Sequence, residues 1–196
     1  MELGLDEPFL DLLPKLKQTL SFKTETGLVI TWDKRKQAYK HEWIKGDKHS
    51  VYFTPKMRDT AIICVHTHPA YLYPSAKYVP PTEMDIRERI VDIIEYGFEA
   101  PNDYVIDQNG IWRLNYLTKS ATEELQKIKQ SDEDYSQFLD AAMHNANNNG
   151  AQLVTRKINL SEYLMKMLNL WGHGMGIDIR YVPYSYLTHT RSKSRI

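Results

Sequence analysis

The chain has 196 residues, and its 25 Lys and Arg balance its 25 Asp and Glu, so the formal net charge at pH 7 is zero. This balance argues against a polycationic protein that binds nucleic acid or a membrane surface, because such proteins need an excess of basic residues to neutralise phosphates. The lone cysteine, Cys64, excludes an intramolecular disulfide and a cysteine-based zinc site, so any metal must be held by histidines and carboxylates.

The composition is that of a globular protein from a reducing compartment. Apolar residues make up 42% of the chain and charged residues 26%, which are ordinary fractions for a domain with a sizeable core. No apolar run is long enough to span a bilayer, and the first residues lack the basic region of a signal peptide. We therefore expect an intracellular protein, located in the cytoplasm or the nucleus.

The first 117 residues predict an α+β (α/β/α-like) domain. One helical pattern covers residues 6–20, and another follows Pro81 as far as Gly97. Strand patterns occupy residues 27–32, 39–43, 51–53, 61–66, 104–106 and 111–114. The last two strand patterns flank Asn109-Gly110, which predicts a type I′ hairpin turn because both residues tolerate positive φ angles.

Residues 118–196 predict a second part, a helical C-terminal extension with a basic tail. Helical patterns cover residues 120–129, 135–144 and 158–170, and a strand pattern covers residues 177–186. The polar run from Asn145 to Gly150 predicts a loop between two of these helices. Arg191, Lys193 and Arg195 make the tail basic.

The most informative stretch is Val65-His66-Thr67-His68-Pro69, followed by Thr82-Glu83-Met84-Asp85. Two histidines at i and i+2 on an extended segment point to the same side, so both imidazoles can reach one metal ion. Asp85 lies in the first turn of the next predicted helix and can supply a third ligand. Two histidines, one aspartate and a water complete a tetrahedral site with an open position, which is typical of catalytic zinc.

Two simpler interpretations compete with this one. Thr82 and Asp85 have the spacing of a helix capping pair, which would explain both residues without a metal. A His-x-His pair at the end of a strand can also be a pair of surface residues. Both alternatives stay open at the level of the sequence, although the combination of all four residues favours the metal site.

The same residues resemble the signature of the JAMM (JAB/MPN/Mov34) metalloproteases, which is a Glu, then His-x-His-Pro, then a Ser or Thr followed by x-x-Asp. The matching residues are Glu25, His66, His68, Pro69, Thr82 and Asp85. The resemblance covers roughly residues 6–117 and implies an MPN/JAB-type core, in which helices flank a curved mixed sheet. Two features depart from the signature: the loop Ala70–Pro81 is six residues longer than usual, and Thr82 replaces the commoner Ser. Lengthening a loop costs little entropy, about 0.6 kcal/mol per doubling, so the site can tolerate it.

The resemblance implies the chemistry of an amide or isopeptide hydrolase. It implies zinc held by His66, His68 and Asp85, Glu25 as general base and then general acid, and Thr82 as a group that stabilises the oxyanion. Glu42 is the alternative general base, because it also lies in a β-rich segment upstream of the histidines. The implied substrate is a conjugate of ubiquitin or a ubiquitin-like protein. Two alternatives are a non-enzymatic MPN-type scaffold that binds partner proteins and a JAMM-fold peptidase with another substrate.

Overall fold

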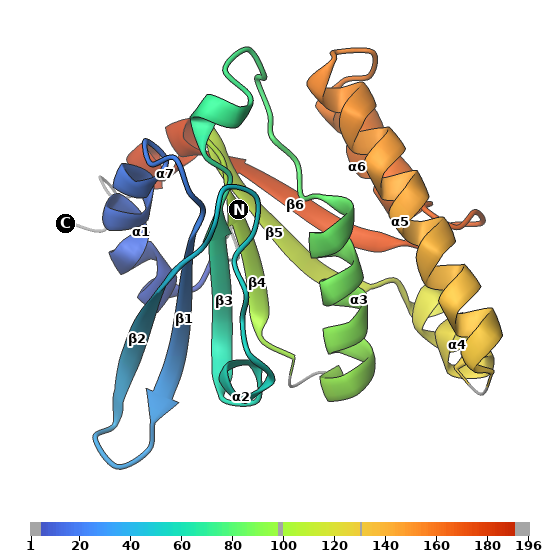
Figure 1. The fold of residues 1–196 in the computed structure, drawn as a ribbon, viewed down its shortest axis with the longest axis horizontal. Helices are drawn as coiled ribbons and strands as arrows, with labels where there is room; N and C mark the ends of the chain where they lie inside the picture. Colours follow the sequence, from blue (N-terminus) through green and yellow to red (C-terminus); the bar gives the residue numbers. More distant parts are fainter. Residues whose placement is uncertain (1–4, 98–99, 130, 191–196) are drawn as a thin grey trace. The chain divides into compact units, whose positions relative to one another are not determined.

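The fold is described from a computed structural model, which describes residues 5–97, 100–129 and 131–190. The predicted α+β fold class is confirmed, because six strands of the described residues form one mixed sheet in the order β2-β1-β3-β4-β5-β6 and helices make up much of the rest (Figure 1). The strands are β1 (Thr26–Asp33), β2 (Ala38–Lys45), β3 (Ala61–Thr67), β4 (Asn102–Ile106), β5 (Gly110–Leu117) and β6 (Ile177–Pro183).

The chain divides into two compact units, each built from separate stretches of sequence. Unit 1 comprises Met1–Tyr78, Pro101–Arg113 and Tyr181–Ile196, and unit 2 comprises Val79–Ala100 and Leu114–Arg180. These units are not consecutive stretches of sequence, so the division predicted at residue 117 stays a prediction. The basic tail predicted at the end of the chain lies outside the described residues.

Unit 1 contains α1 (Glu7–Thr19), α2 (Pro55–Arg58), the 3-10 helix η1 (Ala70–Leu72) and α7 (Tyr184–Thr190). In this unit α1 lies along one face of the sheet (Figure 1). The apolar stripe of α1 meets alternate residues of β1, β3 and β4, and the ring of Phe9 stacks on Tyr104 with centroids 4.4 Å apart. Burying such a stripe supplies most of the free energy that holds a short helix in place. The buried residues of this core are Phe9, Leu13, Leu16, Leu20, Leu28, Ile30, Ile63, Val65, Tyr104, Ile106 and Ile111.

The other face of β1 and β3 is covered by an irregular segment. Val29 and Cys64 pack there against Phe53, and Val51 joins them at the edge of the cluster. The prediction of a strand at residues 51–53 was wrong: these residues pair with no strand, and their alternating apolar pattern reflects packing onto the sheet. The segment ends where Thr54 caps α2 by accepting a hydrogen bond from the Met57 N–H.

The link between β4 and β5 is tight, but it is not the predicted type I′ turn. Neither Asn109 nor Gly110 has a positive φ angle. Instead, the buried carboxylate of Asp107 accepts hydrogen bonds from the N–H groups of both residues at 2.7 and 2.8 Å. Gly110 is needed for a different reason: a Cβ atom there would lie 2.5 Å from the hydroxyl oxygen of Tyr181. The turn is therefore shaped by a buried side chain and a close contact.

Unit 2 contains α3 (Glu83–Tyr96), α4 (Lys119–Ile128), α5 (Asp132–Val154) and α6 (Leu160–Leu168). Within this unit α5 packs against α3, α4 and α6, and Figure 1 shows it running beside α6. The predicted loop at Asn145–Gly150 was wrong, because α5 continues through it without a break. Ala142, Ala146, Asn149 and Leu153 recur at helical spacing and are buried, so packing of this face outweighs the weak helix propensity of the asparagines.

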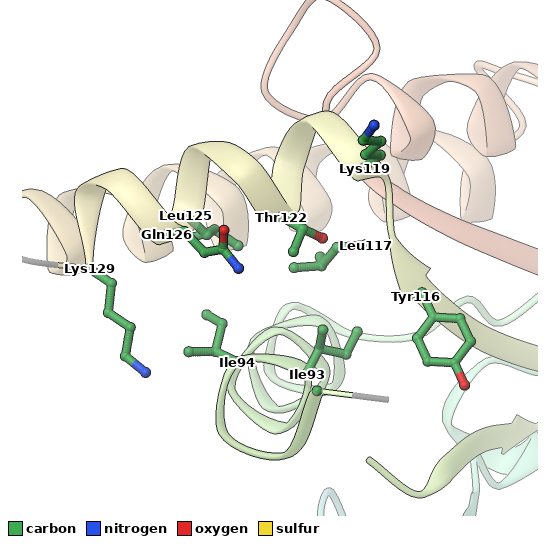
Figure 2. A pocket seen from close by; sticks show the side chains of 10 residues that line it. Ile93, Ile94, Tyr116, Leu117, Lys119, Thr122, Leu125, Gln126 and Lys129 are labelled. Carbon is green, nitrogen blue, oxygen red and sulfur yellow. The ribbon is translucent and has the colours of Figure 1, made fainter. Parts of the chain in front are cut away.

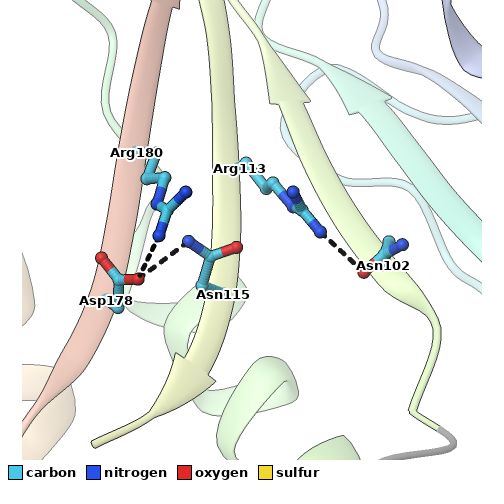
Figure 3. Close-up of polar contacts among 5 residues, drawn as sticks. All are labelled: Asn102, Arg113, Asn115, Asp178 and Arg180. Carbon is cyan, nitrogen blue, oxygen red and sulfur yellow. Dashed lines mark hydrogen bonds and ion pairs between the residues drawn. The ribbon is translucent and has the colours of Figure 1, made fainter. Parts of the chain in front are cut away.

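Polar side chains link the strands beyond β4, as Figure 3 shows. In unit 1, Arg113 on β5 donates a hydrogen bond to the side-chain oxygen of Asn102 on β4 at 3.4 Å. In unit 2, Asn115 on β5 donates to the carboxylate of Asp178 on β6 at 3.0 Å. β6 ends at Pro183, so the predicted strand to residue 186 was too long: Tyr184 begins α7.

Two glycine-to-alanine substitutions should change stability in opposite directions. Gly110→Ala forces a Cβ atom against Tyr181 and the Val182 carbonyl, so we expect the free energy of unfolding to fall by about 1–3 kcal/mol. Gly150→Ala places its Cβ 3.5 Å from Pro80, an ordinary contact inside α5, so we expect a gain of about 0.5–1 kcal/mol. Urea denaturation of both variants measures the two effects, and shifts of the same sign would contradict this account of the two positions.

Candidate metal centre

His66 and His68 lie at the end of β3, an interior strand of the sheet. β3 pairs with β1 in the antiparallel sense and with β4 in the parallel sense, which explains its continuous apolar sequence. The pairing extends past Thr67, because the His68 N–H donates to the Ile106 carbonyl at 2.8 Å. Both histidines are buried, with 7% and 3% of their surfaces exposed. They are therefore not the surface residues that the sequence left as an alternative.

The two imidazoles converge on one point. The Nε2 atoms of His66 and His68 are 3.3 Å apart, so they either share a proton or bind the same cation. Two nitrogens at about 2.0–2.1 Å from a zinc ion, separated by a tetrahedral angle, would lie about 3.3–3.4 Å apart. The histidine pair thus has the spacing of two zinc ligands.

Glu25 directly precedes β1, beside the end of the β1–β3 pairing. The pairing places Gly27 against His66, and one step further a hydrogen bond of 3.0 Å joins the Thr26 N–H to the Thr67 hydroxyl oxygen. Extending this register by two residues predicts that Glu25 faces His68, and directly opposite residues of an antiparallel pair point to the same face. Only 5% of Glu25 is exposed.

The backbone of Glu25 is also hydrogen-bonded to Gly46 and Asp47, the two residues that follow β2. Its N–H donates to the Asp47 carbonyl at 2.8 Å, and its carbonyl accepts from the Gly46 N–H at 3.0 Å. Glu42, the alternative general base, lies in the middle of β2 opposite Val29, and its side chain is exposed. Glu42 is therefore exposed on the edge strand, while Glu25 is buried, and Glu25 stays the predicted general base.

Thr82 and Asp85 form the capping box that the sequence left as an alternative. The Thr82 hydroxyl accepts from the Asp85 N–H at 3.3 Å. In return, Asp85 Oδ2 accepts from the Thr82 N–H at 2.6 Å and from the Thr82 hydroxyl at 2.9 Å. The cap uses one carboxylate oxygen, and a carboxylate has two. Capping and metal binding are therefore compatible, and the cap fixes the orientation of the carboxylate.

The charge of Asp85 also affects the pKa of Tyr163, a buried tyrosine of α6. Tyr163 is fully buried in unit 2, and burial together with the nearby negative charge of Asp85 raises the pKa of its hydroxyl. Tyr163 therefore stays neutral at physiological pH, as its surroundings require.

His66, His68 and Asp85 form a group that could hold a metal ion. No other group of three or more potential ligands is found among the described residues. The donor set of two imidazoles and one carboxylate is one that zinc accepts in catalytic sites. The sequence missed the backbone contacts near Glu25, because they join distant segments. Asp47 accepts from the Glu25 N–H, Thr67 accepts from the Thr26 N–H, and Tyr71 donates to the Lys23 carbonyl.

Figure 2 shows a separate hollow of about 550 Å³ within unit 2. Apolar side chains of α3, including Ile93 and Ile94, face Leu125 of α4 across it. None of the predicted site residues lines this hollow. The hollow therefore contributes nothing to the histidine site.

The sequence matches no model of a known protein family and no curated protein. None of the helices in the described part of the chain has both the length and the hydropathy needed to cross a membrane. Location in the cytoplasm or the nucleus stays a prediction.

Substitutions at Asp85 should separate its two roles. Asp85→Asn keeps an oxygen that accepts from Thr82, so we expect the free energy of unfolding to change by less than about 1 kcal/mol. Zinc binding should nevertheless fall at least about tenfold, because a neutral amide is a poor zinc ligand. Titration calorimetry with zinc and thermal denaturation measure the two properties.

The matched controls for this experiment lie outside the ligand group. Thr82→Ala removes the cap and should lower the free energy of unfolding by about 1 kcal/mol. His41→Ala removes an exposed histidine of β2 and should leave zinc binding unchanged. Equal zinc affinity of the wild type, Asp85→Asn and His68→Ala would contradict the proposed ligand set.

Proposed function

We propose that this protein is a zinc-dependent hydrolase of amide or isopeptide bonds, of the JAMM type that its sequence resembles. The observation that carries the proposal is the 3.3 Å separation of His66 Nε2 and His68 Nε2, together with the burial of Glu25 directly before β1. Asp85 supplies the third ligand in this proposal, as its place in the ligand group supports. An inhibitory or purely structural metal would not need a buried glutamate beside it.

The division of work among the residues follows from their chemistry. When bound, zinc supplies a Lewis acid that lowers the pKa of a water towards about 7 and polarises a carbonyl group. His66 and His68 bind through neutral Nε2 atoms, and their burial keeps bulk water away from the site. Glu25 accepts a proton from the attacking water at its carboxylate and then delivers it to the leaving amine.

In this proposal the Thr82 hydroxyl donates two different hydrogen bonds, one in the resting protein and one during the reaction. In the resting protein its hydroxyl donates to Asp85 Oδ2, which holds this carboxylate in place. Stabilising the oxyanion, the role implied by the JAMM resemblance, requires a donor aimed at the developing charge. The hydroxyl must therefore turn away from Asp85 as the reaction proceeds, while the backbone N–H of Thr82 keeps its own bond to the carboxylate.

The proposed substrate is a protein conjugate with an extended tail, such as that of ubiquitin or a ubiquitin-like protein. β2 is an edge strand, and its last residue, Lys45, pairs with Thr26 beside Glu25. An extended peptide can add to such an edge by main-chain hydrogen bonds. The loop after His68 provides a fixed wall, because Gln108 and Asn109 donate to the carbonyls of Ala76 and Lys77.

Glutamate-to-glutamine substitutions test the proposal. Glu25→Gln should lower kcat for cleavage of a ubiquitin conjugate by about 100-fold or more, because it removes the general base and keeps the side-chain shape. Its zinc content should equal that of the wild type. Glu42→Gln is the matched control and should retain full activity, since its side chain is exposed on β2.

The assay is a cleavage screen with zinc-loaded protein against differently linked ubiquitin chains, ubiquitin-like fusions and unconjugated peptides. Cleavage of the peptides alone would select the peptidase alternative. Stoichiometric zinc binding with no cleavage of any substrate would overturn the enzymatic proposal and favour the scaffold. A wild-type rate equal to that of Glu25→Gln would show that another group is the base.

A further inference from the structure

We propose that Tyr71 is a positioning residue for Glu25: its hydroxyl holds the segment before β1 and so sets where the glutamate lies relative to His68. The catalytic meaning of this inference rests on the proposed function, and its structural part does not. Tyr71 lies in η1, the 3-10 helix that follows His68 and Pro69. It would act through Glu25 and touch no reacting atom.

The contact that carries the inference is a long-range hydrogen bond. The Tyr71 hydroxyl donates to the Lys23 carbonyl at 2.8 Å, across 48 positions of sequence. Lys23 lies two residues before Glu25, in the irregular stretch between α1 and β1. This stretch has no strand geometry of its own, so contacts from other segments must determine its path.

A second bond makes the connection rigid. The Ala70 N–H donates to the Leu20 carbonyl at 3.2 Å. Ala70 and Tyr71, which are neighbours in η1, are therefore hydrogen-bonded to the two ends of the stretch from Leu20 to Lys23. Within η1, the Leu72 N–H donates to the Pro69 carbonyl and the Tyr73 N–H donates to the Ala70 carbonyl. These bonds fix the turn that aims the Tyr71 ring. Only Pro69 and Ala70 separate Tyr71 from His68, so the metal ligand and the glutamate are linked by a short, stiff path.

The negative charge of Glu25 affects the pKa of the Tyr71 hydroxyl. Partial desolvation raises the pKa of Tyr71, which is 39% exposed, and the negative charge of Glu25 raises it further. The phenol therefore stays protonated at neutral pH and keeps donating to Lys23.

Removal of one oxygen atom tests the inference. Tyr71→Phe keeps the ring and deletes the hydrogen bond, and the matched control is Tyr52→Phe, whose ring is 71% exposed. Hydrogen exchange measured by mass spectrometry on the zinc-loaded protein should show faster exchange of the peptide covering residues 21–27 in Tyr71→Phe. The same peptide should exchange at the wild-type rate in Tyr52→Phe. Unchanged exchange in Tyr71→Phe would overturn the inference whether or not the protein is an enzyme.

Kinetics test the link to Glu25. In a cleavage assay, Tyr71→Phe should lower kcat about tenfold with KM and zinc content unchanged, as expected for a misplaced catalytic group. Added to Glu25→Gln, it should cause no further loss, because two changes that act through one group are not additive. A full tenfold loss in the double variant would overturn the positioning role. A wild type without any cleavage would refute the proposed function, and the exchange experiment would then decide the inference alone.

Discussion

The antiparallel pairing of β1 with β3 is the constraint on which the rest of unit 1 depends. Its register aligns Gly27 with His66 and Leu28 with Val65. A shift by one residue would turn every side chain of β1 to the opposite face and remove Leu28 from the core under α1. The hydrophobic core therefore enforces the register on which the proposed position of Glu25 relative to the histidines depends.

The two histidines are polar side chains at the buried end of a strand. His66 and His68 follow a run of apolar residues that are buried on both faces of the sheet, so they enter the protein with β3. Buried polar groups are costly unless they find partners, and a shared cation is one such partner for two converging nitrogens. The contacts of Asp47, Thr67 and Tyr71 hold the backbone at and next to Glu25, whose side chain is buried.

Asp85 fits two roles, in a helix cap with Thr82 and in a group that could hold a metal ion, so the sequence alone left two interpretations of the same motif open. Thr82 and Asp85 form a complete capping box, and Asp85 also belongs to the ligand group. The two roles do not exclude one another, because the cap uses Asp85 Oδ2 and a carboxylate offers a second oxygen. A cap that holds a ligand reduces the freedom that the ligand would lose on binding a metal.

By itself, the sequence determined the elements whose signals are local: α1, β1, β3 and α3 from their periodicity, and the histidine pair from its spacing. Tertiary structure decided what depends on distant partners. The asparagine run is helical because one face of it is buried, and Val51 lies outside any strand because it packs onto the sheet. The sequence favours Glu25 over Glu42 as general base because Glu25 begins the first apolar strand after the helix, and this choice stays a prediction. The two glutamates differ in burial, since Glu25 is 5% exposed and Glu42 lies exposed on β2, and this difference depends on strand pairing between distant segments that no local pattern encodes.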